Sequence, residues 1–264
     1  MNLLKKLIEI QGTSGDELKI RDFIIDYVKS NSSNWKSQPE LHFGDYLQDT
    51  LILTFGKPKT VIFAHTDTIG YTVGYNNELI KIGGPRVIDG TLLVGDDKHG
   101  AIETEIMVVD HEDNSVDIKC VSERVFERGT ALSYKPNFRE TDDYIQSPYM
   151  DNRLGVWVAL EVAKTLENGA IAFSTYEEHG GNAVGFMAKY LQDKFNIRQA
   201  LIADITWVTD GVKHGQGVAI SLRDKGIPRK AYIKRIVEIA QKSKVKYQLE
   251  VESAGGSDGT MMQK

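Results

Sequence analysis

Short apolar runs constrain the fold of this chain more than any other feature. Residues 61–64 (VIFA, within TVIFA at 60–64) and 171–173 (IAF, within IAFST at 171–175) are consecutive apolar residues rather than alternating ones. A strand with one solvent-facing side alternates apolar and polar residues, whereas a strand between two layers of helices is apolar on both sides. We therefore predict that both runs are interior strands of a sheet that helices cover on each face.

Amphipathic stretches that fit helices alternate with the predicted strands. Apolar side chains recur at helical spacing in residues 3–8, 20–28, 154–162, 186–191 and 233–240. Ser14 and Glu17 fit the S-x-x-E pattern of a capping box, which predicts that they begin the second helix. Further strand-like runs lie at residues 50–55 and 200–205. This alternation predicts an α/β fold with a mostly parallel sheet flanked by helices.

The stretch from residue 70 to residue 148 has a different texture. Short β-prone runs are separated there by turn-forming groups such as Asn76-Asn77 and Gly83-Gly84-Pro85, and no helical stripe is evident. We therefore predict two domains. Residues 1–69 and 149–264 form the α/β domain, and residues 70–148 form a small all-β domain inserted into it.

Composition argues against several classes of partner. The 32 Lys+Arg and 37 Asp+Glu residues give a net charge of -5, so we expect neither nucleic acid nor an anionic membrane as a partner. No apolar run approaches the roughly 20 residues that a membrane-spanning helix needs. Cys120 is the only cysteine, so no internal disulfide can form, and we expect a cytoplasmic location.

Acidic residues and one histidine stand where the predicted elements begin or end. They are, in chain order, His65, Asp67, Asp151, Glu177, Glu178 and Asp204. Asp151 stands at the start of a predicted helix, and the other five stand at the ends of predicted strands. Because ligands bind beyond the carboxyl ends of the strands in open α/β sheets, we expect these side chains to meet at one edge of the sheet.

These residue types suit a metal site, and each also has a structural explanation. A metal-bound imidazole usually donates its other N–H to a carboxylate, as His65 and Asp67 would allow, although an H-x-D pair also arises by chance. The two adjacent glutamates repel each other unless solvent or a cation absorbs their charge. Asp151 equally fits a helix N-cap, and Asp204 fits a capped strand end.

Taken together, six stretches resemble the co-catalytic two-metal aminopeptidases of the glutamyl-aminopeptidase or tetrahedral-aminopeptidase type. The stretches are residues 12–17 (GTSGDE), 64–70 (AHTDTIG), 150–155 (MDNRLG), 177–180 (EEHG), 203–204 (AD) and 255–259 (GGSDG). They occur in the family's order and span nearly the whole chain. The resemblance implies a zinc-exopeptidase-like α/β fold with an inserted second domain, and oligomers of identical subunits.

The resemblance also implies a role for each candidate residue. Asp151 would bridge two divalent ions per subunit, His65 and Asp204 would complete one site, and Glu178 would belong to the other. Zinc suits such a mixture of imidazole and carboxylate, and cobalt or manganese are alternatives. Among the catalytic residues, Asp67 would orient the histidine. Glu177 would take a proton from the water that attacks the first peptide carbonyl of a peptide substrate.

The sequence departs from the family at one point. The family's last metal ligand is a histidine well beyond the GGSDG stretch, whereas this sequence ends at Lys264, five residues after Gly259. We expect a C-terminally shortened chain rather than a rebuilt site. Two alternatives stay open: a related two-metal carboxypeptidase or deacylase, and a non-catalytic scaffold whose second metal site is incomplete.

Overall fold

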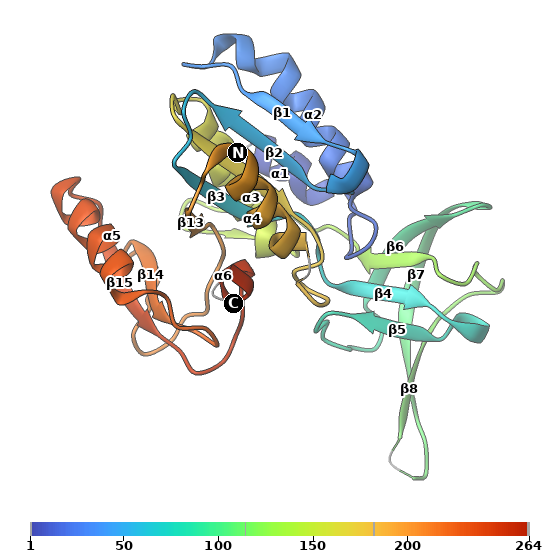
Figure 1. The fold of residues 1–264 in the computed structure, drawn as a ribbon. Coiled ribbons are helices and arrows are strands. Elements are labelled where there is room, and N and C mark those ends of the chain that lie inside the picture. The colour runs from blue at the N-terminus through green and yellow to red at the C-terminus, as the bar shows by residue number, and fades with distance from the viewer. Residues whose placement is uncertain (1, 114, 182, 263–264) are drawn as a thin grey trace.

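The computed structural model describes residues 2–113, 115–181 and 183–262 (Figure 1). Its helices are α1 (Asn2–Glu9), α2 (Leu18–Asn31), α3 (Met150–Ala163), α4 (Ala183–Phe195), α5 (Lys230–Lys242) and α6 (Asp258–Met262), with 3-10 turns η1 (Ser32–Asn34), η2 (Asp45–Leu47) and η3 (Tyr75–Asn77). Its strands are β1 (Glu40–Phe43), β2 (Leu51–Phe55), β3 (Thr60–His65), β4 (Gly70–Val73), β5 (Leu79–Ile82), β6 (Leu92–Asp97), β7 (Gly100–Asp110), β8 (Val116–Cys120), β9 (Ala131–Tyr134), β10 (Arg139–Glu140), β11 (Ile145–Gln146), β12 (Gly169–Ser174), β13 (Gln199–Ile202), β14 (Val218–Arg223) and β15 (Tyr247–Val251).

A five-stranded sheet in the order β1-β2-β12-β3-β13 confirms the predicted α/β class. Strands β12, β3 and β13 run parallel to one another, while β2 is antiparallel to both β12 and β1. The sheet is therefore mixed. A connection as short as the one between β1 and β2 can only join antiparallel neighbours. The parallel part is confined to the three strands that precede the predicted site residues.

The central strands are buried on both faces, as their sequences predict. All six residues of β12 and all five of β2 are buried. Alternate residues of β12 belong to different cores, because Ile171 and Phe173 pack with α2 and α3, whereas Ala170 and Ala172 pack with α4. The sheet is thus the middle one of three layers. Because helices cover both of its faces, a binding site is expected where its strands end.

The antiparallel sheet β5-β4-β9-β6-β7-β8 has a core of its own. The buried residues of that core all lie between Tyr71 and Leu132, and they include Cys120, whose burial raises the pKa of its thiol to about 11. Figure 1 shows the β7–β8 hairpin extending away from the rest of the molecule. Because this core is separate, we propose that residues 70–148 form one domain and residues 1–69 and 149–264 the other.

The capping-box prediction for Ser14 and Glu17 is wrong. Helix α2 begins at Leu18, and Glu17, at its N-cap position, makes no side-chain capping bond. The Ser14 hydroxyl instead donates to Asp67 at 2.6 Å, and the Glu17 carboxylate accepts from the backbone N–H groups of Gly15 and Tyr176. Both side chains are engaged by partners from the site region.

The chain from β14 to β15 forms a small unit beside the central sheet (Figure 1). Strands β14 and β15 pair in parallel, and the helix predicted from residues 233–240, which is α5, connects them. The strand β14 has no counterpart among the sequence predictions. Across the described ranges, no helix is long and apolar enough to cross a membrane.

Candidate active site

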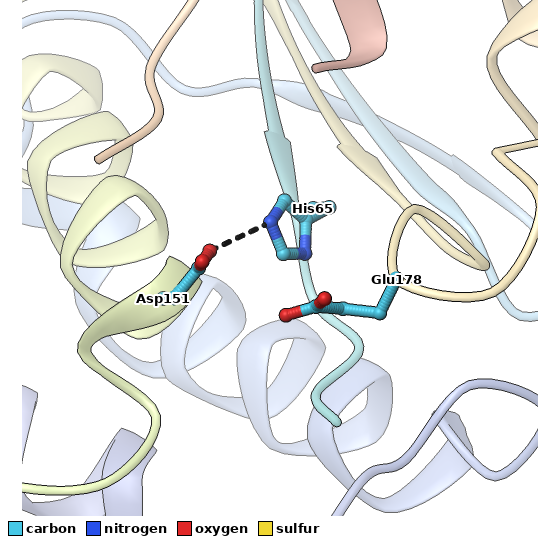
Figure 2. Close-up of side chains that lie close together, drawn as sticks. All are labelled: His65, Asp151 and Glu178. Carbon is cyan, nitrogen blue, oxygen red and sulfur yellow. Dashed lines mark hydrogen bonds and ion pairs between the residues drawn. The ribbon is translucent and has the colours of Figure 1, made fainter. Parts of the chain in front are cut away.

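Three of the predicted residues converge from three segments of the chain (Figure 2). His65 is the last residue of β3, Asp151 stands in the first turn of α3, and Glu178 lies in the loop after β12. One potential ligand atom from each lies within 4.8 Å of the others. His65 Nε2 is 3.1 Å from Asp151 Oδ1, and Figure 2 shows the Glu178 carboxylate directed toward the same space.

Asp204 lies at the margin of this group. Its Oδ1 is 3.7 Å from His65 Nε2, and 18% of its side chain is exposed. The backbone N–H of Ala203 donates to the carbonyl of Phe63 at 2.8 Å, which extends the pairing of the two parallel strands past the end of β13. This register brings Asp204 beside His65, as the argument from parallel strand ends predicts.

Asp67 is fully buried and connects the ends of β3 and β12. Its carboxylate accepts hydrogen bonds from the backbone N–H groups of Glu177 at 3.1 Å and Glu178 at 3.0 Å, and from the Ser14 hydroxyl. Its Oδ1 lies 3.4 Å from His65 Nδ1, which is also 3.2 Å from the Asp67 backbone carbonyl. Asp67 therefore contacts the histidine and also holds the loop that carries both glutamates.

Carboxylates predominate in the site. Burial and the neighbouring carboxylates together raise the pKa of Glu177 to about 8 and that of Glu178 to about 7, although His65 opposes both increases. Burial alone would lower the pKa of His65, but hydrogen bonds to Asp151, Asp204 and Asp67 outweigh it and hold the pKa well above the usual value. The surrounding carboxylates thus favour a cation at this position.

The donor set fits a divalent metal ion. One imidazole nitrogen and several carboxylate oxygens are the ligands that zinc, cobalt and manganese accept. A bound cation would offset the repulsion that raises the glutamate pKa values. His179 does not join this set, because its Nδ1 accepts from the backbone N–H of Gly83 at 3.2 Å. A neutral imidazole that accepts at Nδ1 carries its proton on Nε2.

Asp258 had no predicted role, yet it lies near His65, Asp204 and Asp67, whose charges act on it. This residue opens α6 and is 1% exposed. The Ser174 hydroxyl at the end of β12 donates to Oδ2 of Asp258, while Oδ1 is buried and has no hydrogen-bond partner within the described ranges. Burial raises its pKa to about 6. The GGSDG stretch at residues 255–259 was the signal that could have identified it.

Asn152 ties the start of α3 to the end of β13. Its side-chain amide donates to the Ala203 carbonyl at 2.8 Å and accepts from the backbone N–H of Gly155 at 3.0 Å. Each neighbour of this link, Asp151 on one side and Asp204 on the other, is a predicted metal ligand. Asn152 therefore sets the separation of two candidate ligands.

Gly155→Ala is expected to lower the free energy of unfolding by about 1–3 kcal/mol, the usual cost of overpacking. A methyl group at this position would overlap both Asn152 Oδ1 and the Ala203 carbonyl. Urea unfolding of the metal-free protein, followed by circular dichroism, measures the change. Gly185→Ala in α4 is the matched control, since its methyl group would meet nothing within 4 Å. Equal midpoints for the two variants would contradict the role of Asn152.

Comparisons of sequence agree on one family. A family model described as M42 glutamyl aminopeptidase matches residues 76–264. A relative from Acetivibrio thermocellus that is named an aminopeptidase is 26% identical over an alignment 289 residues long, gaps included, and the alignment covers 97% of this chain and 84% of the relative. Another from Escherichia coli K12, also named an aminopeptidase, is 24% identical over an alignment 301 residues long, which covers 98% of this chain and 82% of the relative.

Solved structures share the fold. The TET aminopeptidase from a marine sediment archaeon of the Thaumarchaeota superposes with a TM-score of 0.84 at 18% identity, over 99% of this chain and 84% of that one. The TET1 peptidase of Pyrococcus horikoshii, described as assembling into a tetrahedron or a large octahedral shell, gives a TM-score of 0.77 at 23% identity. That match covers 99% of this chain and 87% of the other.

Proposed function

This chain belongs to the M42 glutamyl aminopeptidase family, and from that premise we propose that it removes residues from the free N-terminus of peptides at the site around His65. Membership of the family makes the protein an aminopeptidase, a hydrolase of peptide bonds. The observation that carries the location of the site is the convergence of His65, Asp151 and Glu178 within 4.8 Å. These residues come from the ends of elements where an open α/β sheet binds its ligands.

His65, Asp151, Glu178 and Asp204 are the residues that would hold two divalent ions per subunit, with Asp151 shared between them. The position of Asp151, 3.1 Å from His65 Nε2, supports this assignment. Two such ions supply the polarisation of a peptide carbonyl and a water of lowered pKa. Zinc is our first choice, and cobalt and manganese are the alternatives, because all three accept imidazole and carboxylate ligands.

Glu177 is the proposed general base. It follows the end of β12, and its backbone N–H donates to Asp67 at 3.1 Å, which supports a position beside the proposed ligands. With a pKa of about 8 in the metal-free site, this carboxyl group is largely protonated at neutral pH. Glu177 would accept the proton of the attacking water and return it to the leaving amine, once its pKa is lowered by positive charge on the neighbouring carboxylates.

We further propose that identical subunits assemble into a homo-oligomer. The assembly described for the Pyrococcus horikoshii TET1 peptidase supports this, as do exposed apolar residues on the antiparallel sheet, among them Met107 and Val116. The substrates would be peptides, without nucleic acid or membrane lipid as a partner. A cytoplasmic location is the proposal that accords with a single, buried, reduced cysteine.

Chelation followed by reconstitution tests the function. We expect chelator-treated protein to lose hydrolysis of peptides with a free N-terminus, and zinc or cobalt to restore it, with two ions per chain by elemental analysis. N-acetylated versions of the same peptides should stay intact. Hydrolysis of blocked substrates alone would point to a carboxypeptidase or deacylase. At most one ion per chain without any turnover would point to a non-catalytic scaffold.

A further inference from the structure

Glu17 is a buried carboxylate that the proposed chemistry does not use. Its residue is 0% exposed, and it lies outside the group of potential metal ligands. One oxygen, Oε2, accepts from the backbone N–H of Gly15 at 2.9 Å, and the other, Oε1, accepts from the backbone N–H of Tyr176 at 3.2 Å. The second contact joins residues 159 positions apart in the chain. Glu17 therefore links the N-terminal loop to the loop after β12.

Tyr176 occupies a position in the backbone that needs such support. It is the residue directly before Glu177 and has a φ of 62°, in the left-handed region. A bulky side chain adopts this conformation only where surrounding contacts impose it. The backbone N–H of Gly181 donates to the Tyr176 carbonyl and closes the loop, so the peptide groups on both sides of Tyr176 are engaged.

Two buried acidic side chains, Glu17 and Asp67, bind the backbone of the loop after β12. The backbone N–H of Tyr176 binds Glu17, and the N–H groups of Glu177 and Glu178 bind Asp67. Three consecutive N–H groups thus point at fixed acceptors, which leaves the loop little freedom. Hydrogen bonds to a charged acceptor are stronger than neutral ones. Asp67 is such an acceptor, because hydrogen bonds hold its pKa low, whereas burial raises the pKa of Glu17 to about 7, so Glu17 restrains Tyr176 chiefly by the geometry of its two contacts.

A buried arginine provides the opposite charge. Arg153 is 0% exposed, and its Nη2 donates to the Ile10 carbonyl at 3.1 Å, while Nε and Nη1 are buried and have no hydrogen-bond partner among the residues that the structure describes. Burial lowers its pKa to about 10, and attraction to Asp67, Tyr149 and Glu17 opposes that decrease. The guanidinium therefore offsets part of the cost of burying both carboxylates.

We propose that Glu17 is a positioning residue, which fixes the backbone of Tyr176 and so sets where Glu177 and Glu178 present their carboxylates. The proposal rests on the proposed function of those two glutamates. Glu17 is not one of the potential ligands His65, Asp151 and Glu178, and it would act through the loop. Residues that orient ligands in this way typically contribute about 10–100-fold to metal affinity or activity.

Glu17→Gln is the informative variant. A glutamine of the same length keeps one acceptor oxygen, but its amide N–H₂ faces a backbone N–H, so one of the two contacts is lost. We expect a kcat about 10–100-fold below wild type with KM within about threefold, since the loop and not the substrate contact is disturbed. Glu161→Gln, on the surface of α3 beside Lys164, removes a carboxylate elsewhere and is the matched control.

Hydrogen exchange of the metal-free protein tests the anchoring without any enzymatic assay. In wild type, we expect the Tyr176 amide to exchange as slowly as the amides of β12. In Glu17→Gln, exchange of residues 175–181 should accelerate at least tenfold while β12 is unchanged, and Glu161→Gln should match wild type. Unaltered exchange in Glu17→Gln would overturn the proposal, as would a Tyr176 amide that exchanges in wild type like an open loop.

The outcomes separate this proposal from the proposed function. Accelerated loop exchange in a protein whose wild type hydrolyses no peptide supports the anchoring role and refutes the function. Full turnover in wild type together with unchanged kcat in Glu17→Gln supports the function and overturns the positioning role. If Glu17→Gln does not fold, Glu17→Asp replaces it: this variant keeps the charge but is too short to reach both N–H groups, and it should show the same accelerated exchange of residues 175–181.

Discussion

Glu177→Gln is expected to lower kcat by about 10²–10⁴-fold, the range that a general base contributes to an enzymatic reaction. Glutamine has the shape of glutamate but cannot take a proton from water. KM and metal content should stay close to wild type, because Glu177 is held by its backbone contact with Asp67 and is not a proposed ligand. Steady-state kinetics on a free-amine peptide, with elemental analysis of the same sample, measures both.

Two comparisons make this result specific. Glu167→Gln removes an exposed carboxylate that pairs with Lys36 far from the site, and it should keep full turnover. The circular dichroism spectrum of Glu177→Gln should match wild type. A folded, metal-loaded Glu177→Gln enzyme that retains wild-type kcat would rule out Glu177 as the base and leave another group to be found.

Asp67→Asn is expected to cost about 3–5 kcal/mol of folding free energy, the usual effect of breaking a buried charge network by removing one partner. The asparagine amide would face backbone N–H groups of Glu177 and Glu178 that now bind a carboxylate. The same substitution should weaken zinc binding by about 10–100-fold, because the loop and His65 lose their common support. Urea unfolding of the metal-free protein and calorimetric zinc titration measure these two effects.

Ser14→Ala measures how much one of the hydrogen bonds to Asp67 contributes to stability. It removes only the hydroxyl that donates to Asp67 at 2.6 Å, and a single hydrogen bond to a charged group is worth about 1.5–3 kcal/mol. Stability should therefore fall in the order wild type, Ser14→Ala, Asp67→Asn. An Asp67→Asn protein that is as stable as Ser14→Ala and binds zinc like wild type would show that the backbone contacts of Asp67 carry little energy.

The layered fold and the proposed metal ligands could be predicted from the sequence because the patterns that indicate them are local. A strand buried on both faces is apolar along its length, so β3 and β12 could be recognised individually. Parallel strands end at the same edge, so polar residues placed just after them were expected to meet. His65, Asp151 and Glu178 do converge, and Asp204 lies beside them.

The residues that were missed depend on partners far away in the chain. Ser14 and Glu17 match a local helix-capping pattern, but their hydrogen bonds go to residues 53 and 159 positions away. Asp258 accepts a hydrogen bond from Ser174, which is 84 positions away in the chain, and the sequence around one residue gives no signal of the other. The strand β14 was also missed: its partner β15 lies beyond a whole helix, and its inner positions are only partly buried, so its pattern is weak.

The chain enters and leaves the antiparallel sheet close to proposed ligands. Strand β4 starts at Gly70, shortly after His65, and Tyr149, whose hydroxyl donates to the Tyr134 carbonyl of β9, stands two residues before Asp151. Both connections between the two proposed domains therefore run next to the proposed site. We expect one residue added in either connection to alter the span between His65 and Asp151, whereas the β7–β8 hairpin extends away from that site (Figure 1).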